Sequence, residues 1–248
     1  MAVTEASASP ARAVALAERL ASVRSAIATA ARAVGRDPAG IALLPVSKTR
    51  PLSDVLALTE CGGPALFGEN RPQELARKAE ALPEGSPVRF ALIGHLQTNK
   101  AGLAARWAAQ FQALDSLHLA AALDRRLQAE GRGLDVFIEV NTSGEAAKHG
   151  LEPAAVPSFA SQLGAMASLR PRGLMTVALD SPDREAVAAC FERLCQVRAR
   201  LREDGVLGLP WDELSMGMSG DYELAIAHGA TIIRLGTALF GAREPAPA

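Results

Sequence analysis

A lysine stands at the end of a short apolar segment near the start of the chain. Lys48 follows the apolar residues 41–46 and lies in the phrase Val-Ser-Lys-Thr-Arg-Pro at 46–51. Only four of the 26 basic residues are lysines. Arginine serves wherever a plain positive charge is enough, whereas an amine can lose its proton and form a Schiff base with an aldehyde. Lys48 is therefore a candidate Schiff-base lysine, and the alternative is a lysine that only extends into solvent.

Small residues after two later apolar segments could hold an anion. Ser219 and Gly220 are expected to open a helix, where free backbone N–H groups and the helix dipole favour negative charge. Gly236 lets the backbone approach a ligand closely, and Thr237 adds a hydroxyl. Each alone is also explained as a helix cap or a turn residue, but together they predict a phosphate site.

Two further polar residues lie at or just after the end of an expected strand. Arg234 shares a strand face with Ile232, which predicts a guanidinium that is buried or at a rim. Its partner is then a carboxylate, as is usual for a buried arginine, or a ring nitrogen of a ligand. Asn70 ends the phrase Phe-Gly-Glu-Asn and either lies near a ligand or caps the helix containing Pro72 and Leu75.

The histidines give no local sign of a metal site. They are scattered along the chain without metal-ligand spacing: His95, His118, His149 and His228. The phosphate-binding and zinc-protease motifs are also missing. The sequence therefore predicts no metal ligand and no catalytic residue.

Short apolar segments alternate with helical patterns along the chain. The expected strands are 41–47, 65–68, 89–94, 111–115, 134–140, 171–177, 213–217 and 231–235. The expected helices between them are 53–61, 71–82, 99–108, 117–131, 153–166, 183–204 and 220–228. Eight strands joined by helices predict a parallel sheet closed into a (β/α)8 TIM-type barrel, whose working face lies at the carboxyl ends of the strands.

Two helices have a clear apolar face. An N-terminal helix that precedes the barrel and ends near Gly35 is indicated by one stripe: Leu16, Leu20, Val23, Ile27 and Val34. The 183–204 helix has Ser181 and Pro182 as expected cap and first-turn proline. Its apolar face is Val187, Cys190, Phe191, Leu194, Val197 and Leu201.

Length and composition favour one domain. The 248 residues are near the roughly 250 typical of such barrels, and we expect a loose segment at 1–9, the barrel at 10–241 and a loose tail at 242–248. A net charge of −1 argues against binding to nucleic acid or to an anionic membrane. Three cysteines, no secretion signal and no long apolar segment predict a cytoplasmic protein.

The chain resembles the pyridoxal phosphate homeostasis protein family. The matching phrases are VSKTRP (46–51), FGEN (67–70), IGHLQTNK (93–100), VNTSGEAAKHG (140–150), RGLMT (172–176), LSMGMSGDYE (214–223) and RLGTALFG (234–241). The resemblance implies the barrel of alanine racemase-like enzymes, with pyridoxal 5′-phosphate carried on Lys48. It also implies that Arg234 faces the pyridine nitrogen, that Asn70 lies near the ring, and that Ser219, Gly236 and Thr237 hold the phosphate.

We expect a carrier of the cofactor rather than an enzyme. An arginine stays protonated and opposes a pyridinium, which weakens the electron sink that most chemistry of this cofactor needs. No opposing base for racemisation is evident, because the only tyrosine, Tyr222, falls in the expected phosphate-loop helix. The expected partners are pyridoxal phosphate and apo enzymes that use it. The alternatives are a single-domain amino-acid racemase and, more remotely, a Schiff-base aldolase acting through Lys48.

Overall fold

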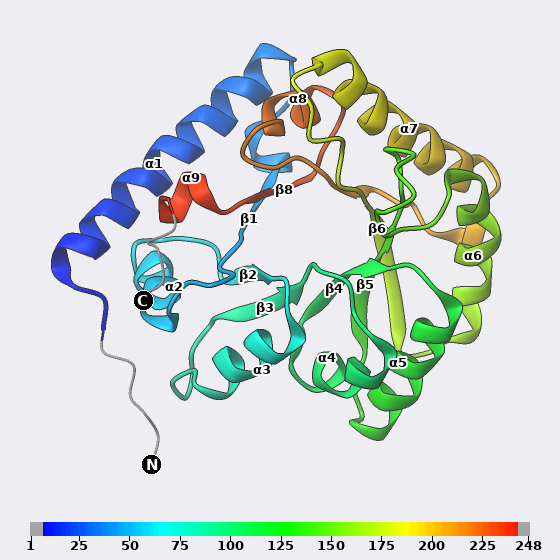
Figure 1. The fold of residues 1–248 in the computed structure, drawn as a ribbon, viewed down its shortest axis with the longest axis horizontal. Coiled ribbons are helices and arrows are strands. Elements are labelled where there is room, and N and C mark those ends of the chain that lie inside the picture. Colours follow the sequence, from blue (N-terminus) through cyan, green and yellow to red (C-terminus); the bar gives the residue numbers. More distant parts are fainter. Residues whose placement is uncertain (1–6, 243–248) are drawn as a thin grey trace.

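The computed structural model describes residues 7–242 as an eight-stranded barrel surrounded by helices (Figure 1). The strands are β1 Ala42–Pro45, β2 Leu66–Glu69, β3 Arg89–Leu92, β4 Gln110–Leu114, β5 Leu134–Glu139, β6 Leu169–Met175, β7 Glu213–Ser215 and β8 Ile232–Leu235. The helices are α1 Pro10–Ala33, α2 Leu52–Glu60, α3 Pro72–Glu80, α4 Ala101–Trp107, α5 Leu117–Ala129, α6 Val156–Gln162, α7 Arg184–Glu203, α8 Tyr222–Ala227 and α9 Thr237–Phe240. The predicted fold class is confirmed. Most of the expected loose segments at 1–9 and 242–248 lies outside the described residues, namely 1–6 and 243–248. The division of the chain stays a prediction.

The sheet is parallel throughout and closes on itself. Its strand order is β1-β8-β7-β6-β5-β4-β3-β2. The two ends of that order meet where Val46 pairs with Gly68, and the Ser47 N–H donates to the Gly68 carbonyl at 3.0 Å. Continuous apolar strands suit this arrangement, because the barrel interior covers one face and the helices cover the other.

The N-terminal helix packs across the outside of the barrel. Ser9 caps α1 by accepting from the Arg12 N–H, and Pro10 takes the first helical position. The predicted stripe is buried at Leu16, Leu20, Val23 and Ile27. It contacts α2, α8 and α9, so the first helix lies beside the last one (Figure 1). Val34 does not belong to the stripe, because it lies past the helix end and is 43% exposed.

Three expected helices begin or end differently. The cap of α7 is Asp183, which accepts from the N–H groups of Glu185 and Ala186, so the prediction of Ser181 and Pro182 was wrong, although the predicted apolar face is buried. The expected helix at 153–166 is a short α-helix between two 3-10 turns. The α8 helix begins at Tyr222 rather than at 220, and α9 was not predicted.

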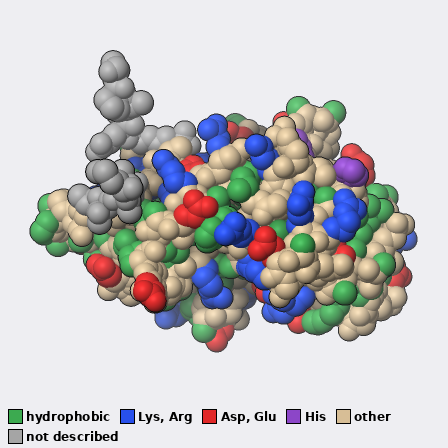
Figure 2. All heavy atoms as spheres, turned by 90° about the horizontal axis from the view of Figure 1, so that it is seen from below, with side chains coloured by type: hydrophobic (Ala, Val, Ile, Leu, Met, Phe, Trp, Pro, Cys, Tyr) green, Lys and Arg blue, Asp and Glu red, His purple; other side chains and the backbone are tan. Residues whose placement is uncertain are grey.

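No helix of the described residues is both long enough and apolar enough to cross a membrane. On the face in Figure 2, basic and acidic side chains are interspersed instead of forming fields of one sign. That distribution agrees with the net charge of −1.

Candidate functional site

The predicted site residues come from four neighbouring strands of the barrel. Lys48 follows β1, Asn70 follows β2, Ser219 follows β7, and Arg234, Gly236 and Thr237 lie on or after β8. Since the strand order runs β7-β8-β1 and closes onto β2, all six residues lie on one half of the barrel at the carboxyl ends of the strands. This is where barrels of this kind place their working residues.

Lys48 lies in a turn that the rest of the protein holds firmly. The Arg50 N–H donates to the Ser47 carbonyl, and Thr49 has φ of +64°. A β-branched residue rarely adopts a positive φ, so the turn stores backbone strain next to Lys48. The Lys48 side chain is half-buried, and its ammonium group makes no hydrogen bond or ion pair with any residue in the described range. The amine is therefore available to a ligand.

A buried ionic network supports that turn and was missed by the sequence analysis. The Lys78 ammonium donates to the Ser47 carbonyl at 2.7 Å, to Glu69 Oε1 at 2.6 Å and to Glu74 Oε1 at 3.0 Å. Glu69 also accepts from the Ser47 hydroxyl at 2.6 Å, and Glu74 accepts from the Thr49 N–H at 2.7 Å. Burial raises the pKa of Glu69, and Lys78 and Ser47 oppose the rise. Both residues flanking Lys48 are thus anchored by side chains from β2 and α3.

Arg234 is buried at the base of the site. Its Nη1 donates to the Ser215 hydroxyl at 2.8 Å and its Nη2 to the Thr176 carbonyl at 2.7 Å. Burial lowers the pKa of Arg234 to about 10, while the charges of Asp221 and Glu139 oppose this fall. The guanidinium therefore remains charged at neutral pH. Among the described residues, no carboxylate accepts a hydrogen bond from Arg234. Two neutral oxygen atoms hold its side chain in place instead.

Asn70 does not cap the following helix. The residue at the cap position of α3 is Arg71, whose side chain makes no capping hydrogen bond. Asn70 Oδ1 is instead buried, and it has no hydrogen-bond partner among residues 7–242. A buried acceptor left unpaired costs roughly 1–3 kcal/mol, so this oxygen is a ready position for a ligand donor.

The two small-residue loops lie at the same end of the barrel, but not as predicted. Ser219 and Gly220 form the turn before α8 and do not open the helix, whose cap position is Asp221. The loop is fixed at Gly217, which has φ of +95° and accepts from the Arg234 N–H at 2.9 Å. Gly236 lies against Val46, since an added Cβ would be 3.3 Å from the Val46 carbonyl oxygen. Ser219 and Thr237 are exposed to solvent there.

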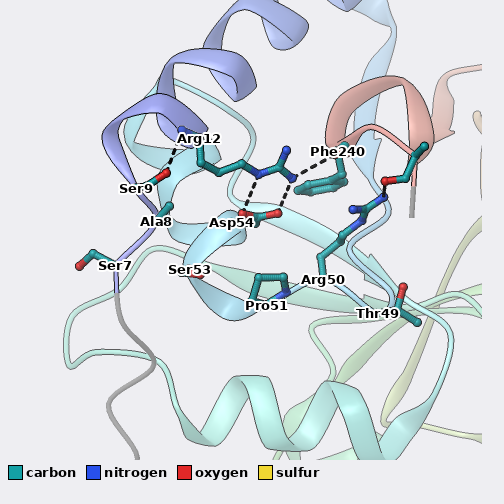
Figure 3. Close-up of a pocket in the computed structure, with 11 residues that line it drawn as sticks. Ser7, Ala8, Ser9, Arg12, Thr49, Arg50, Pro51, Ser53, Asp54 and Phe240 are labelled. Atoms are coloured by element: carbon teal, nitrogen blue, oxygen red, sulfur yellow. Dashed lines mark hydrogen bonds and ion pairs between the residues drawn. The ribbon is translucent and has the colours of Figure 1, made fainter. Parts of the chain in front are cut away.

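A cavity of about 790 Å³ adjoins the turn on its outer side (Figure 3). It is lined by Thr49 and Arg50 together with the first residues of α1 and α2 and the end of α9. Arg12 and Asp54 form an ion pair across it, and Arg50 donates to the Gly241 carbonyl. Lys48 does not line this cavity, so we assign it to helix packing and not to the site.

The other half of the barrel mouth carries a carboxyl group with a raised pKa. Glu139 ends β5 and is 8% exposed, and its Oε2 has no hydrogen-bond partner in the part of the chain that the structure describes. Burial raises the pKa of Glu139 to about 7, Asp115 adds to the rise, and Arg234 opposes it. This raised pKa was not predictable from the sequence, because the burial of a strand-end glutamate depends on the loops that cover it.

The sequence matches the family of the alanine racemase N-terminal domain over residues 8–244. It is 42% identical to a pyridoxal phosphate homeostasis protein of Pseudomonas aeruginosa, over 92% of this chain and 96% of the relative, and 38% identical to one of Escherichia coli, over 92% and 97%. The structure of PipY from Synechococcus elongatus with pyridoxal phosphate bound is 34% identical, with a TM-score of 0.80, and covers 91% of this chain and 100% of PipY.

Alanine racemases share the fold. That of Streptomyces coelicolor gives a TM-score of 0.70 at 21% identity, over 93% of this chain and 59% of the racemase. The relatives of higher identity match along nearly their whole length. This chain belongs to the pyridoxal phosphate homeostasis protein family, built on the alanine racemase N-terminal domain.

Proposed function

We propose that this protein binds pyridoxal 5′-phosphate reversibly on Lys48 as a Schiff base and serves in the homeostasis of that cofactor without turning over a substrate. The observation that carries the proposal is the half-buried amine of Lys48, which has no protein partner among the described residues and sits in an anchored turn. The name shared by the relatives and the cofactor bound to PipY support it.

The residues around Lys48 fit this cofactor. The unpaired Asn70 Oδ1 suits a donor on a bound ring, and the cationic Arg234 suits an acceptor such as a ring nitrogen. Gly236, Thr237 and Ser219 supply backbone and hydroxyl groups for a phosphate at the two exposed loops. The groups proposed to hold the aldehyde, the ring and the phosphate thus come from one half of the barrel mouth.

The cofactor supplies an aldehyde. Lys48 would hold this aldehyde through its amine as a Schiff base, with loss of water, and addition of water would release the cofactor again. Anchoring of the phosphate would raise the effective concentration of the aldehyde beside Lys48.

The same residues argue against turnover. Arg234 remains protonated, and as a donor to the ring nitrogen it would leave the ring without the charge that stabilises a carbanion. Tyr222, at the start of α8, directs its hydroxyl to Glu223 at 3.4 Å. Neither residue provides the base that a racemase needs.

Borohydride reduction followed by peptide mapping tests the attachment. Reduction of the loaded protein should fix the cofactor on the peptide containing Lys48 and on none of the peptides with Lys78, Lys100 or Lys148. Label on another lysine would refute the assignment. The reduced protein should also be unable to pass the cofactor to an apo enzyme, whereas the untreated protein should do so.

An amino-acid racemase is the alternative, favoured by the fold shared with alanine racemases. Racemisation exchanges the Cα hydrogen with solvent. We expect no incorporation of deuterium into alanine in heavy water at ordinary enzyme rates, and incorporation that depends on Lys48 would establish the alternative.

A further inference from the structure

Two histidines and an aspartate meet at the half of the barrel mouth opposite to the Lys48 site. His95 follows β3, Asp115 follows β4, and His149 lies in the loop after β5. Their nitrogen and oxygen ligand atoms all lie within 4.8 Å of one another. We propose that these three side chains bind a divalent transition-metal ion, with Zn²⁺ as the best match.

The types of donor decide the class of ion. Imidazole nitrogen atoms favour zinc, copper and nickel over magnesium or calcium, and one carboxylate completes a common zinc set. Three protein ligands leave a fourth position open, as in zinc sites that bind water or a ligand. The sequence predicts no metal site, because these three residues are far apart in the chain. The barrel brings them together by aligning the ends of three successive strands.

The spacing is already close to that of a zinc site. Zinc bonds of roughly 2.0–2.1 Å in a tetrahedron separate the ligand atoms by about 3.3 Å. His95 Nδ1 and Asp115 Oδ2 are 3.5 Å apart. The rings of His95 and His149 are stacked, with centroids 3.9 Å apart and planes inclined by 9°. A small closing movement therefore brings three donors to bonding distance.

One ring must turn to aim its nitrogen at the ion, because parallel planes direct the lone pairs in parallel. The side chains are free to do so. His95 and His149 are both exposed, and in the described part of the chain they make no hydrogen bond or ion pair beyond that of His95 with Asp115. His95 also lines a cavity of about 510 Å³ with Asn70, so the ion would border the Lys48 half of the mouth.

Metal binding should be measured on the full, untagged chain by calorimetric titration with Zn²⁺ and by the visible ligand-field bands of Co²⁺. We expect one equivalent to bind. His95→Gln and His149→Gln should each weaken binding by roughly tenfold or more, since even the loss of outer-shell partners weakens metal sites by that factor. Zn²⁺ should raise the melting temperature of the wild type and not of these variants.

His228→Gln is the matched control. His228 Nδ1 is 3.7 Å from Glu192 Oε2, a pair similar to His95 and Asp115, but no second imidazole joins it in the described structure. Cys61→Ser controls for an exposed thiol. Both should bind Zn²⁺ like the wild type. The proposal would be overturned by any of three results: Zn²⁺ binding that does not saturate near one equivalent, Zn²⁺ binding that survives both His95→Gln and His149→Gln, or an equal loss of Zn²⁺ affinity in His228→Gln. A chain that binds Zn²⁺ but never binds pyridoxal phosphate would refute the proposed function alone.

Discussion

Removal of the Lys78 charge tests how the turn that carries Lys48 is held. Lys78 is 3% exposed and donates to three oxygen atoms, one of them on Glu69, which is fully buried. Lys78→Met keeps most of the side-chain volume but leaves that carboxylate without its counter-charge. Breaking a buried pair from one side costs about 3–5 kcal/mol. Domains are typically stable by about 5–15 kcal/mol, so the variant should fold and be measurably weaker.

The double variant separates charge from packing. Lys78→Met combined with Glu69→Gln removes the unpaired charge of Glu69 and leaves Glu74 bonded to the Thr49 N–H, so it should be more stable than Lys78→Met alone. Lys100→Met is the control, because Lys100 is half-buried but its ammonium group makes no hydrogen bond or ion pair in the described range, and the change should alter stability by less than about 0.5 kcal/mol. Urea unfolding measures all four proteins.

The same variants should change cofactor loading. Ser47 and Thr49 lose their shared anchor in Lys78→Met, and a misplacement of about 1 Å can cost up to a hundredfold in rate. Attachment to Lys48 should therefore slow by about tenfold or more, and less in the double variant. The reasoning is refuted if Lys78→Met loses less than about 1 kcal/mol and loads at the wild-type rate.

Three further predictions concern single residues. Burial raises the pKa of Glu139 from 4.5 to about 7, so the folded chain loses stability as the pH rises through that window and the buried carboxyl group becomes charged. Glu139→Gln removes this charge. In thermal unfolding it should stabilise the cofactor-free chain by up to about 3 kcal/mol near pH 8 and little near pH 5. Equal effects at both pH values would contradict this. Asp183→Ala should cost about 1 kcal/mol through loss of the α7 cap, whereas Ser181→Ala should be nearly neutral; the reverse order would restore the sequence prediction. Arg234→Gln should weaken cofactor binding by about 10–100-fold in an equilibrium titration, because a hydrogen bond to a charged group contributes about 1.5–3 kcal/mol. An unchanged affinity would remove Arg234 from the site.

The barrel was predictable because its signals are local and periodic. Short apolar segments alternated with helical stripes, and a closed sheet is the arrangement that buries eight such strands. The site positions were predictable because parallel strands place their carboxyl ends together. Lys48, Asn70 and Arg234 therefore fell on one side of the barrel once the strands were counted.

The parts that were missed depend on contacts between distant residues. Lys78 is an ordinary helical lysine in the sequence, and only the packing of α3 against the β1 and β2 ends shows that it anchors the turn that carries Lys48. Ser219 looked like a helix cap because it precedes a glycine and a helical pattern. Asp221 displaced it, since its carboxylate accepts from the Met218 N–H and closes the preceding turn.

The most direct test of the central claim is the absorption spectrum during titration with pyridoxal phosphate, for the wild type beside Lys48→Ala. A yellow Schiff-base band should saturate near one equivalent in the wild type and be absent in Lys48→Ala. Lys78→Met should show the band with slower growth. A wild-type protein that stays colourless with excess cofactor, or a Lys48→Ala variant that gives the same band, would contradict the account.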